Sequence, residues 1–234
     1  TFTIAGPIAG NVPLTVSCLG TIALTRTNTY DGGTTISAGT LALSGSGGLL
    51  STGAVSANGT STFSISGLSG SGTTVGDLTT VSGATVALGS KSLTFGTSGS
   101  TAISGDIMGA GGSIVKQGSG TVTLSGTNSY TGGTTINAGT FIGNTSSLQG
   151  NISNGAVLQF TQTSEVLSFT GNSSGFAGTT SVQSGTLNLN GTLSGTTTID
   201  LGATLSGNAT VHAMTNNGTV APGNSIGTVY VVGD

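Results

Sequence analysis

The chain has 234 residues, a net charge of −3 and only 4% charged residues. A nucleic-acid partner requires several clustered lysines or arginines against its phosphates, and the sequence holds three basic residues in all, so this class of partner is excluded. A run of about 20 apolar residues, which a membrane-spanning helix needs, is also absent from the sequence.

Glycine occurs 44 times, and serine and threonine are comparably abundant, whereas good helix formers are rare. Glycine costs up to about 1 kcal/mol at each helical position, so we expect few helices. Disorder is the alternative for such a composition, but apolar residues make up 34% of the chain and alternate with polar ones. Regular alternation of this kind predicts half-buried strands.

Taken in chain order, the pattern predicts short strands separated by turns. Gly-Gly and Asn-Gly pairs, which tolerate positive φ, predict turns at 32–33, 58–59, 132–133, 154–155, 190–191 and 217–218. The strands are expected near residues 21–25, 34–37, 40–44, 61–66, 84–88, 92–95, 101–104, 121–125, 134–137, 156–160, 166–170, 186–189 and 228–232.

One segment of the chain occurs twice. Residues 20–40 read GTIALTRTNTYDGGTTISAGT and residues 120–140 read GTVTLSGTNSYTGGTTINAGT, with 14 of 21 positions identical. A looser copy, FTGNSSGFAGTTSVQSGTLNL, occupies residues 169–189. Repeats of this size indicate one structural unit stacked on copies of itself. Antiparallel meanders could use the same turns, but the repeat favours an all-β solenoid, a right-handed parallel β-helix of about ten coils. Offsets of 100 and 46 residues between copies then predict whole numbers of coils, each of about 20 to 25 residues.

The segment 90–140 resembles the autotransporter-associated β-strand repeat of bacterial type V secretion passengers, through GSKSLTFG followed by AISGDIMGAGGSIVKQGSGTVTLSGTNSYTGGTTINAGT. The N-terminal segment FTIAGPIAGNVPLTVSCLGTIALTRTNTYDGGTTI is similar to a second, more diverged copy. The end, LSGNATVHAMTNNGTVAPGNSIGTVYVVGD, is similar to the passenger segment that precedes the autochaperone region and the membrane barrel. The resemblance implies that residues 1–234 form a single β-helical passenger fragment of a larger exported polypeptide. Its repeat copies lie near 1–41, 90–141 and 166–190, and a C-terminal passenger segment covers 203–234.

This resemblance also implies a function. We expect a non-enzymatic, rod-like passenger that is exported across the outer membrane to the bacterial cell surface or secreted. It would act in adhesion or aggregation, with host or bacterial surface molecules, protein or glycan, as partners.

Other functions remain open from the sequence. A self-assembling subunit of an extracellular fibre or surface layer is the main alternative, because open coil ends and low charge favour association. Ice binding is a lesser alternative, since Thr-x-Thr pairs occur at Thr60/Thr62, Thr121/Thr123 and Thr196/Thr198. A toxin passenger is another.

The sequence offers little for catalysis. G-x-S-x-G occurs at 171–175 and 223–227, but a nucleophile elbow needs a strand–turn–helix context, a histidine and an acid, and His212 is the only histidine. The six acidic residues are scattered and no metal-ligand cluster occurs. We therefore expect no catalytic residue, no cofactor and no metal, and His212 is interpreted as a surface or turn residue. The residues that bind a partner are not identified by the sequence.

A few positions stand out between the copies. Arg26 and Asp31 replace the Gly and Thr of the second copy, which favours a local ion pair, with a ligand contact as the alternative. Tyr30, Tyr130 and Phe176 occupy one place in the three copies, which predicts packing, with a carbohydrate-stacking platform as the alternative.

Cys18 is the only cysteine and lies in a turn-like position. The chain therefore cannot form an internal disulfide. We expect its thiol to be partly accessible, with intermolecular bonding as the alternative.

Overall fold

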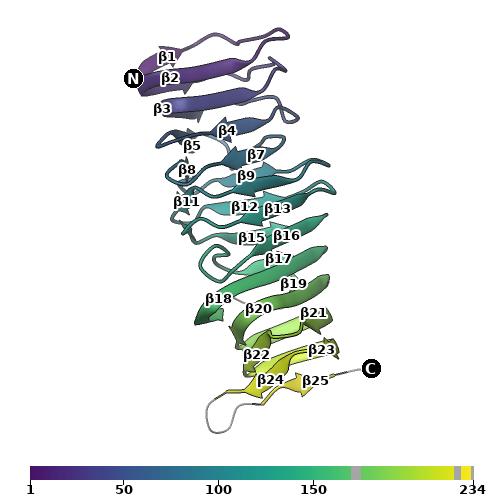
Figure 1. The fold of residues 1–234 in the computed structure, drawn as a ribbon. Coiled ribbons are helices and arrows are strands. Elements are labelled where there is room, and N and C mark those ends of the chain that lie inside the picture. The colour runs from purple at the N-terminus through teal and green to yellow at the C-terminus, as the bar shows by residue number, and fades with distance from the viewer. Residues whose placement is uncertain (170–174, 224–227, 233–234) are drawn as a thin grey trace.

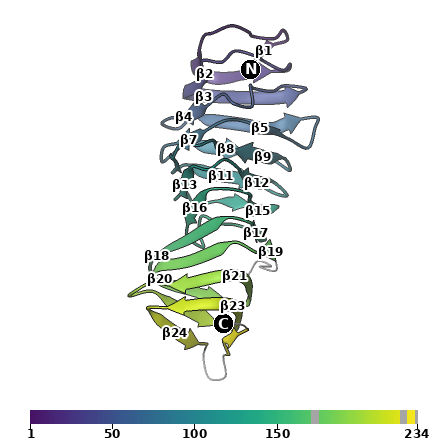
Figure 2. The same cartoon turned by 90° about the vertical axis from the view of Figure 1, so that its right-hand side faces the viewer.

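The chain folds into a rod of stacked coils (Figures 1 and 2). The computed structural model describes residues 1–169, 175–223 and 228–232, with side chains placed except at 162–169 and 175–176. These residues form strands and turns without a helix, so none of the described elements is a helix that could cross a membrane. The strands pair in parallel and complete about 11 turns, which confirms the predicted right-handed parallel β-helix.

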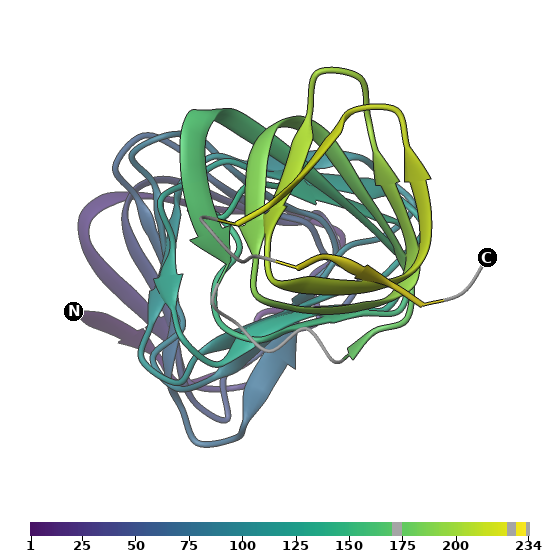
Figure 3. The ribbon, with the colours of Figure 1, turned by 90° about the horizontal axis from the view of Figure 1, so that it is seen from below.

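Each coil passes through three walls, which give the three-sided outline seen along the axis in Figure 3. Wall A contains β4 (Val55–Ala57), β7 (Leu78–Thr80), β10 (Thr101–Ile103), β13 (Thr121–Leu124) and β16 (Thr140–Gly143). Wall B contains β1 (Phe2–Ile4), β5 (Thr62–Leu68), β8 (Thr85–Ala87), β11 (Asp106–Gly109), β14 (Ser129–Tyr130), β22 (Thr204–Gly207) and β24 (Thr219–Pro222). Wall C is a six-stranded sheet of β6 (Gly72–Thr74), β9 (Ser92–Phe95), β12 (Ser113–Lys116), β15 (Gly133–Ile136), β17 (Ile152–Asn154) and β19 (Gly175–Phe176).

Long strands join the walls. Those that bend from wall A to wall B are β2 (Leu14–Leu24), β3 (Thr34–Gly45), β18 (Val157–Phe169) and β20 (Thr179–Leu189). Two strands pass from wall C to wall A, namely β21 (Gly191–Ile199) and β23 (Ala209–Asn216), and β25 (Tyr230–Val231) pairs with β23. Shifts of register mark the bends, as expected where an extra residue turns a strand.

The core is a set of columns in which side chains of successive coils stack in register. In wall B, Leu41, Phe63, Val86 and Ile107 follow one another and are 0% exposed. Removing such side chains from water contributes roughly 1.5–3 kcal/mol each. Successive side chains of a strand point to opposite faces, and one face of each strand lies in this core while the other faces outward. This arrangement explains the predicted alternation of apolar and polar residues.

The copies of the repeat do not lie one above another, so the prediction of whole numbers of coils is wrong. Thr34–Ile36 of the first copy lies in β3 of wall A, whereas the equivalent residues 134–136 lie in β15 of wall C. Coil length varies from 15 residues (Leu205 to Val220) to 23 residues (Val55 to Leu78). Because each corner tolerates a different number of residues, 100 residues end one wall short of a complete coil.

The identical positions of the two copies build contacts between coils. Asn28 is 1% exposed; its Oδ1 accepts a hydrogen bond from the Ile8 amide at 2.9 Å, and its Nδ2 donates to Gly48 O at 2.9 Å. Asn128 likewise accepts from Ile107 N at 2.7 Å and donates to Ser147 O at 2.6 Å. Each asparagine therefore links the coil before it to the coil after it.

The tyrosine and threonine of the motif form a second buried contact. Tyr30 Oη lies 2.7 Å from Thr34 Oγ1, and Tyr130 Oη lies 2.7 Å from Thr134 Oγ1. Both tyrosines are buried, at 2% and 1% exposure, so the predicted packing role is confirmed for these two and a stacking platform is wrong. The side chain of Phe176 lies outside the described residues.

Glycine closes the corner that follows. Gly39 and Gly139 have φ of 71° and 69°, in the left-handed region where glycine carries no steric penalty. A Cβ at Gly39 would lie 2.0 Å from Cys18 O, and one at Gly139 would lie 2.4 Å from Gly120 O. The motif therefore specifies a tight corner as well as two buried polar contacts.

We predict that Asn128→Ala lowers the free energy of unfolding by about 2 to 4 kcal/mol, because a buried amide and a buried carbonyl lose their partner. Urea unfolding followed by circular dichroism measures this difference. Asn137→Ala is the matched control, since Asn137 is an exposed residue of the same motif, and it should stay within about 0.5 kcal/mol of the parent. Equal losses in both variants would contradict the role of Asn128.

Burial raises the pKa of Tyr130 to about 12 from 10.0, although its bond to Thr134 opposes the shift. The unfolded chain thus loses the Tyr130 proton at lower pH than the folded chain. The stability that the buried, protonated Tyr130 contributes is therefore complete below the pKa of the unfolded chain, and it is lost as the pH rises through the pKa of the folded chain. We expect the unfolding free energy to fall between pH about 10 and about 12, and to fall less steeply in Tyr130→Phe. Urea titrations across this window, with tyrosinate absorbance, measure it; an unchanged slope in Tyr130→Phe would refute it.

Candidate binding surface

The outward residues of wall A form one column along the rod, which we call the outer hydroxyl column. Most of its members carry a hydroxyl group, none is charged, and each lies in register with the next coil. A hydroxyl group donates and accepts hydrogen bonds with water, so this face can be solvated while it carries no charge on its members. The members are Thr15, Thr35, Ser56, Thr79, Ala102, Thr123, Ile142, Gln159, Ser181, Thr198 and Thr215.

The Thr-x-Thr pairs are not arranged as one array. Thr121/Thr123 and Thr196/Thr198 lie on wall A, but Thr62 pairs with Thr40 and Thr85 on wall B. Between the two wall A pairs, the neighbouring coils present Ile142 and Gln159 in the same column. An ordered lattice of threonines, which ice binding would use, is therefore interrupted.

The described carboxylates act mainly within the fold. Asp77 Oδ1 accepts hydrogen bonds from Thr97 N at 2.9 Å and Thr97 Oγ1 at 2.8 Å, and Asp106 Oδ1 accepts from Thr127 N at 2.9 Å. Each of these bonds joins one coil to the next. Carboxylates already bound to neighbouring coils are poor candidates for acid–base chemistry.

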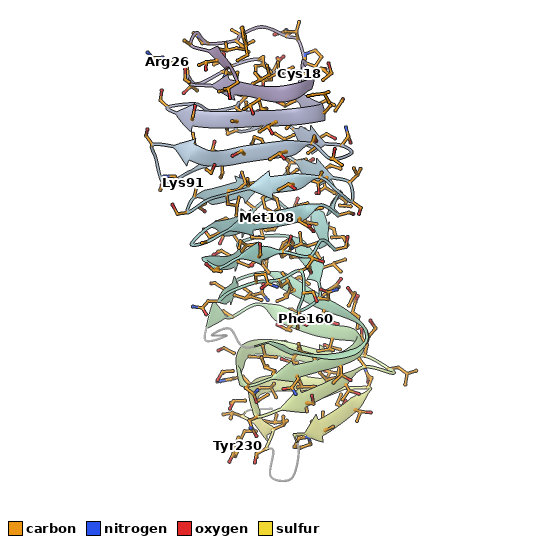
Figure 4. All side chains as sticks on the ribbon, turned by 90° about the vertical axis from the view of Figure 1, so that its left-hand side faces the viewer. Cys18, Arg26, Lys91, Met108, Phe160 and Tyr230 are labelled. Atoms are coloured by element: carbon orange, nitrogen blue, oxygen red, sulfur yellow. The ribbon has the colours of Figure 1, made fainter. Side chains whose placement is uncertain are left out.

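Arg26 and Asp31 are both exposed, and no ion pair joins these two described residues, so the predicted local ion pair is wrong. The backbone explains this, because Asn28 turns inward between them and its Nδ2 donates to Arg26 O at 2.7 Å. Figure 4 shows Arg26 at the edge of the rod near its N-terminal end, whereas Tyr230 lies near the opposite end.

Wall C carries a shallow groove on the outside of the rod. It has a volume of about 310 Å³ over β6 and β9, and it is lined by Ser71, Gly72, Thr73, Thr74, Ser92 and Thr94. Its lining offers hydroxyl groups without a charge, an imidazole or an aromatic ring. The groove can accept and donate hydrogen bonds, but these groups supply no nucleophile activated by a base.

The candidates for catalysis are not brought together. Ser173 of the first G-x-S-x-G motif and Ser225 of the second lie outside the described residues. His212 is exposed on β23, as expected for a surface residue. Among the residues that the structure describes, His, Cys, Asp and Glu form no group of three that could hold a metal.

Cys18 is exposed in the bend of β2, as predicted for an accessible thiol. Its Sγ lies 3.7 Å from Gly20 O. Leu19 beside it is 97% exposed, so this bend presents apolar surface to solvent.

The sequence did not predict the buried ammonium group of Lys116. Its side chain is 0% exposed and stands between Phe95 and Ile136 in an inward column of wall C. Nζ donates to Gln117 O and Gly118 O at 2.8 Å and to Ala138 O at 3.1 Å. Burial lowers the pKa of Lys116, and the Asp77 carboxylate opposes that shift. The signal was present in the sequence, because Lys116 occupies an inward position of Ser113–Lys116 where the first copy has Val16.

Comparison with known proteins agrees with this architecture. Residues 19–43, 114–142 and 164–189 match the family model described as passenger-associated-transport-repeat. Over 144 residues, or 59% of this chain, the sequence is 40% identical to a protein named Adhesin BmaC autotransporter, from Brucella suis biovar 1 (strain 1330). The chain spans 4% of the length of that relative. No solved structure gives a significant match.

We predict that Lys116→Met lowers the free energy of unfolding by about 1 to 3 kcal/mol, because three backbone carbonyls lose their donor. Urea unfolding of the purified chain measures the change. Lys91→Met is the matched control, because it removes the same charge from a lysine whose side chain forms no hydrogen bond with the described residues. Its free energy of unfolding should stay within about 0.5 kcal/mol of the parent. A Lys116→Met protein as stable as Lys91→Met would show that the carbonyls do not need the ammonium.

Proposed function

We propose that the chain acts as a non-enzymatic rod in adhesion, as an autotransporter passenger with passenger-associated transport repeats that is exported to the cell surface; the repeat matches and the similarity to an adhesin autotransporter support this. The rod holds a neutral face at a distance from its point of attachment and binds host or bacterial surface molecules, protein or glycan. We further propose that residues 1–234 act as one β-helical unit, supported by parallel pairing from β1 to β25.

The outer hydroxyl column is the observation that supports this proposal best. It repeats one type of chemistry, a neutral hydrogen-bonding group, on nearly every coil of wall A, at the spacing of about 4.8 Å between parallel strands. Many weak contacts along one direction add up when they are made by a single rigid body. The relative named as an adhesin supports the same function.

The test is adhesion of cells that display the rod, compared with cells that display only the membrane anchor. We expect Thr123→Glu/Thr198→Glu, which places two carboxylates on wall A, to reduce adhesion strongly. Thr94→Glu/Thr135→Glu is the matched control on wall C, and it should leave adhesion near the parent level. Circular dichroism establishes that both double variants are folded.

Two outcomes would contradict this proposal. Display of the rod could give no gain in adhesion over the anchor alone, which would remove the function. Adhesion could instead be lost only in the wall C variant, which would place the contact at the groove and not on wall A.

A second candidate function is self-assembly into an extracellular fibre or surface layer. The observation that favours it is again the outer hydroxyl column, because its own members carry no charge and add no charge repulsion between two copies that meet along it. Sedimentation velocity over a wide concentration range, with negative-stain images, tests this candidate. Concentration-dependent filaments or sheets would support it, and a monomeric rod at every concentration would remove it.

A further inference from the structure

Buried polar atoms without a hydrogen-bond partner gather in one part of the rod. Among the described side chains, these atoms are Thr101 Oγ1, Thr180 Oγ1, Asn188 Oδ1, Thr197 Oγ1 and Ser206 Oγ. All but the first belong to β20, β21 and β22, which form two consecutive coils. A buried polar group without a partner loses its bonds to water and gains none in return.

Two of these groups are stacked in the core of wall A. Thr180 is 1% exposed and Thr197 is 0% exposed, and the two residues are neighbours in register. Leu158 precedes them in the column and Met214 follows. The neighbours of this pair in the preceding and following coils are therefore apolar, and neither threonine hydroxyl has a hydrogen-bond partner among the described residues.

The other copies of the repeat show what is missing. Thr34 and Thr134 occupy the equivalent position, and each hydroxyl lies 2.7 Å from a tyrosine Oη. In the third copy the sequence has Phe176 where the others have tyrosine, and phenylalanine carries no hydroxyl. The same threonine is thus hydrogen-bonded in two copies and without a partner in the third.

A second pair lies on wall B of the same two coils. Asn188 and Ser206 are neighbours in register, and neither Asn188 Oδ1 nor Ser206 Oγ has a partner. Unsatisfied groups therefore occur on two walls at the same height of the rod.

Packing is also lighter here. Fully buried aromatic side chains occur in earlier coils, up to Phe160, but none is buried among the side chains described after it. The coil from Val182 to Ile199 has 17 residues, against 22 from Leu41 to Phe63. Shorter coils without aromatic rings remove less apolar surface from water.

We propose that the coils of residues 179–207 are a built-in weak point at which the rod opens first. Each unsatisfied buried group shifts the opening equilibrium of its coil by roughly 5- to 150-fold. The opened segment would lengthen the rod while the coils on either side stay folded. That mechanical consequence rests on the proposed function as a surface-displayed rod, whereas the local weakness does not.

Hydrogen exchange of the whole chain, followed by mass spectrometry, tests the proposal. We expect amides of 179–207 to exchange at least about tenfold faster than those of 34–43 and 133–143, in line with a smaller opening free energy. Uniform protection along these segments, or slower exchange in 179–207, would overturn the proposal.

The same substitution at equivalent positions should give opposite signs. Thr180→Val removes a hydroxyl that has no partner, so we expect exchange in 179–207 to slow by roughly fivefold or more. Thr134→Val removes a hydroxyl bonded to Tyr130 and should speed exchange around β15. Thr197→Val is a second variant, and we expect it to slow exchange in 179–207 as Thr180→Val does. Faster exchange in both Thr180→Val and Thr197→Val would overturn the proposal.

Pulling single rods from both ends tests the consequence under load. We expect the first extension step of the parent chain to occur at lower force than that of Thr180→Val/Thr197→Val. An identical first step in the two proteins would show that the weak point does not govern extension. Adhesion is measured separately at zero load, so the two results distinguish failure of this proposal from failure of the adhesive function.

Discussion

The backbone ladder between consecutive coils is the constraint on which the rest of this structure depends. Parallel strands must stay about 4.8 Å apart over the whole rod, so the residues of each paired strand lie directly above or below residues of the adjacent coils. At the Gly39 corner this leaves no space for a side chain, because a Cβ there would collide with Cys18 O. In the interior, it means that a polar group must find its partner in its own coil or in an adjacent one. Asn28 and Asn128 meet that requirement by bonding in both directions.

Much of the fold could be predicted from the sequence because this ladder leaves a simple pattern. The alternation in the predicted strands 40–44 and 61–66 agrees with the buried positions of Leu41 and Phe63, and the repeat indicated a solenoid. The wall on which each copy lies could not be predicted, because coil length depends on how many residues each corner holds. The coils from Leu205 to Val220 and from Val55 to Leu78 show this difference in length. The mean spacing of the copies conceals that variation.

Side-chain roles were harder to predict where a residue departs from its class. Lys116 carries a charge, and charge normally indicates solvent exposure, yet its position in the alternation is inward and three carbonyls surround its Nζ. Arg26 and Asp31 were close in sequence and opposite in charge, but the chain turns Asn28 inward between them. In each case the local backbone direction decided the outcome. The outer hydroxyl column, the proposed binding surface, forms no sequence motif, because its members are ordinary outward residues related only by register.

The different walls occupied by the first two copies bear on how this chain could engage a partner. Residues 34–36 lie on wall A, and the equivalent residues 134–136 lie on wall C, so the two copies present the same motif in different directions around the rod. One flat receptor therefore cannot touch that motif in both copies at once. The third copy returns to wall A at Thr180, so each added repeat increases the reach of the rod, while the lengths of the coils between copies decide which direction the motif faces.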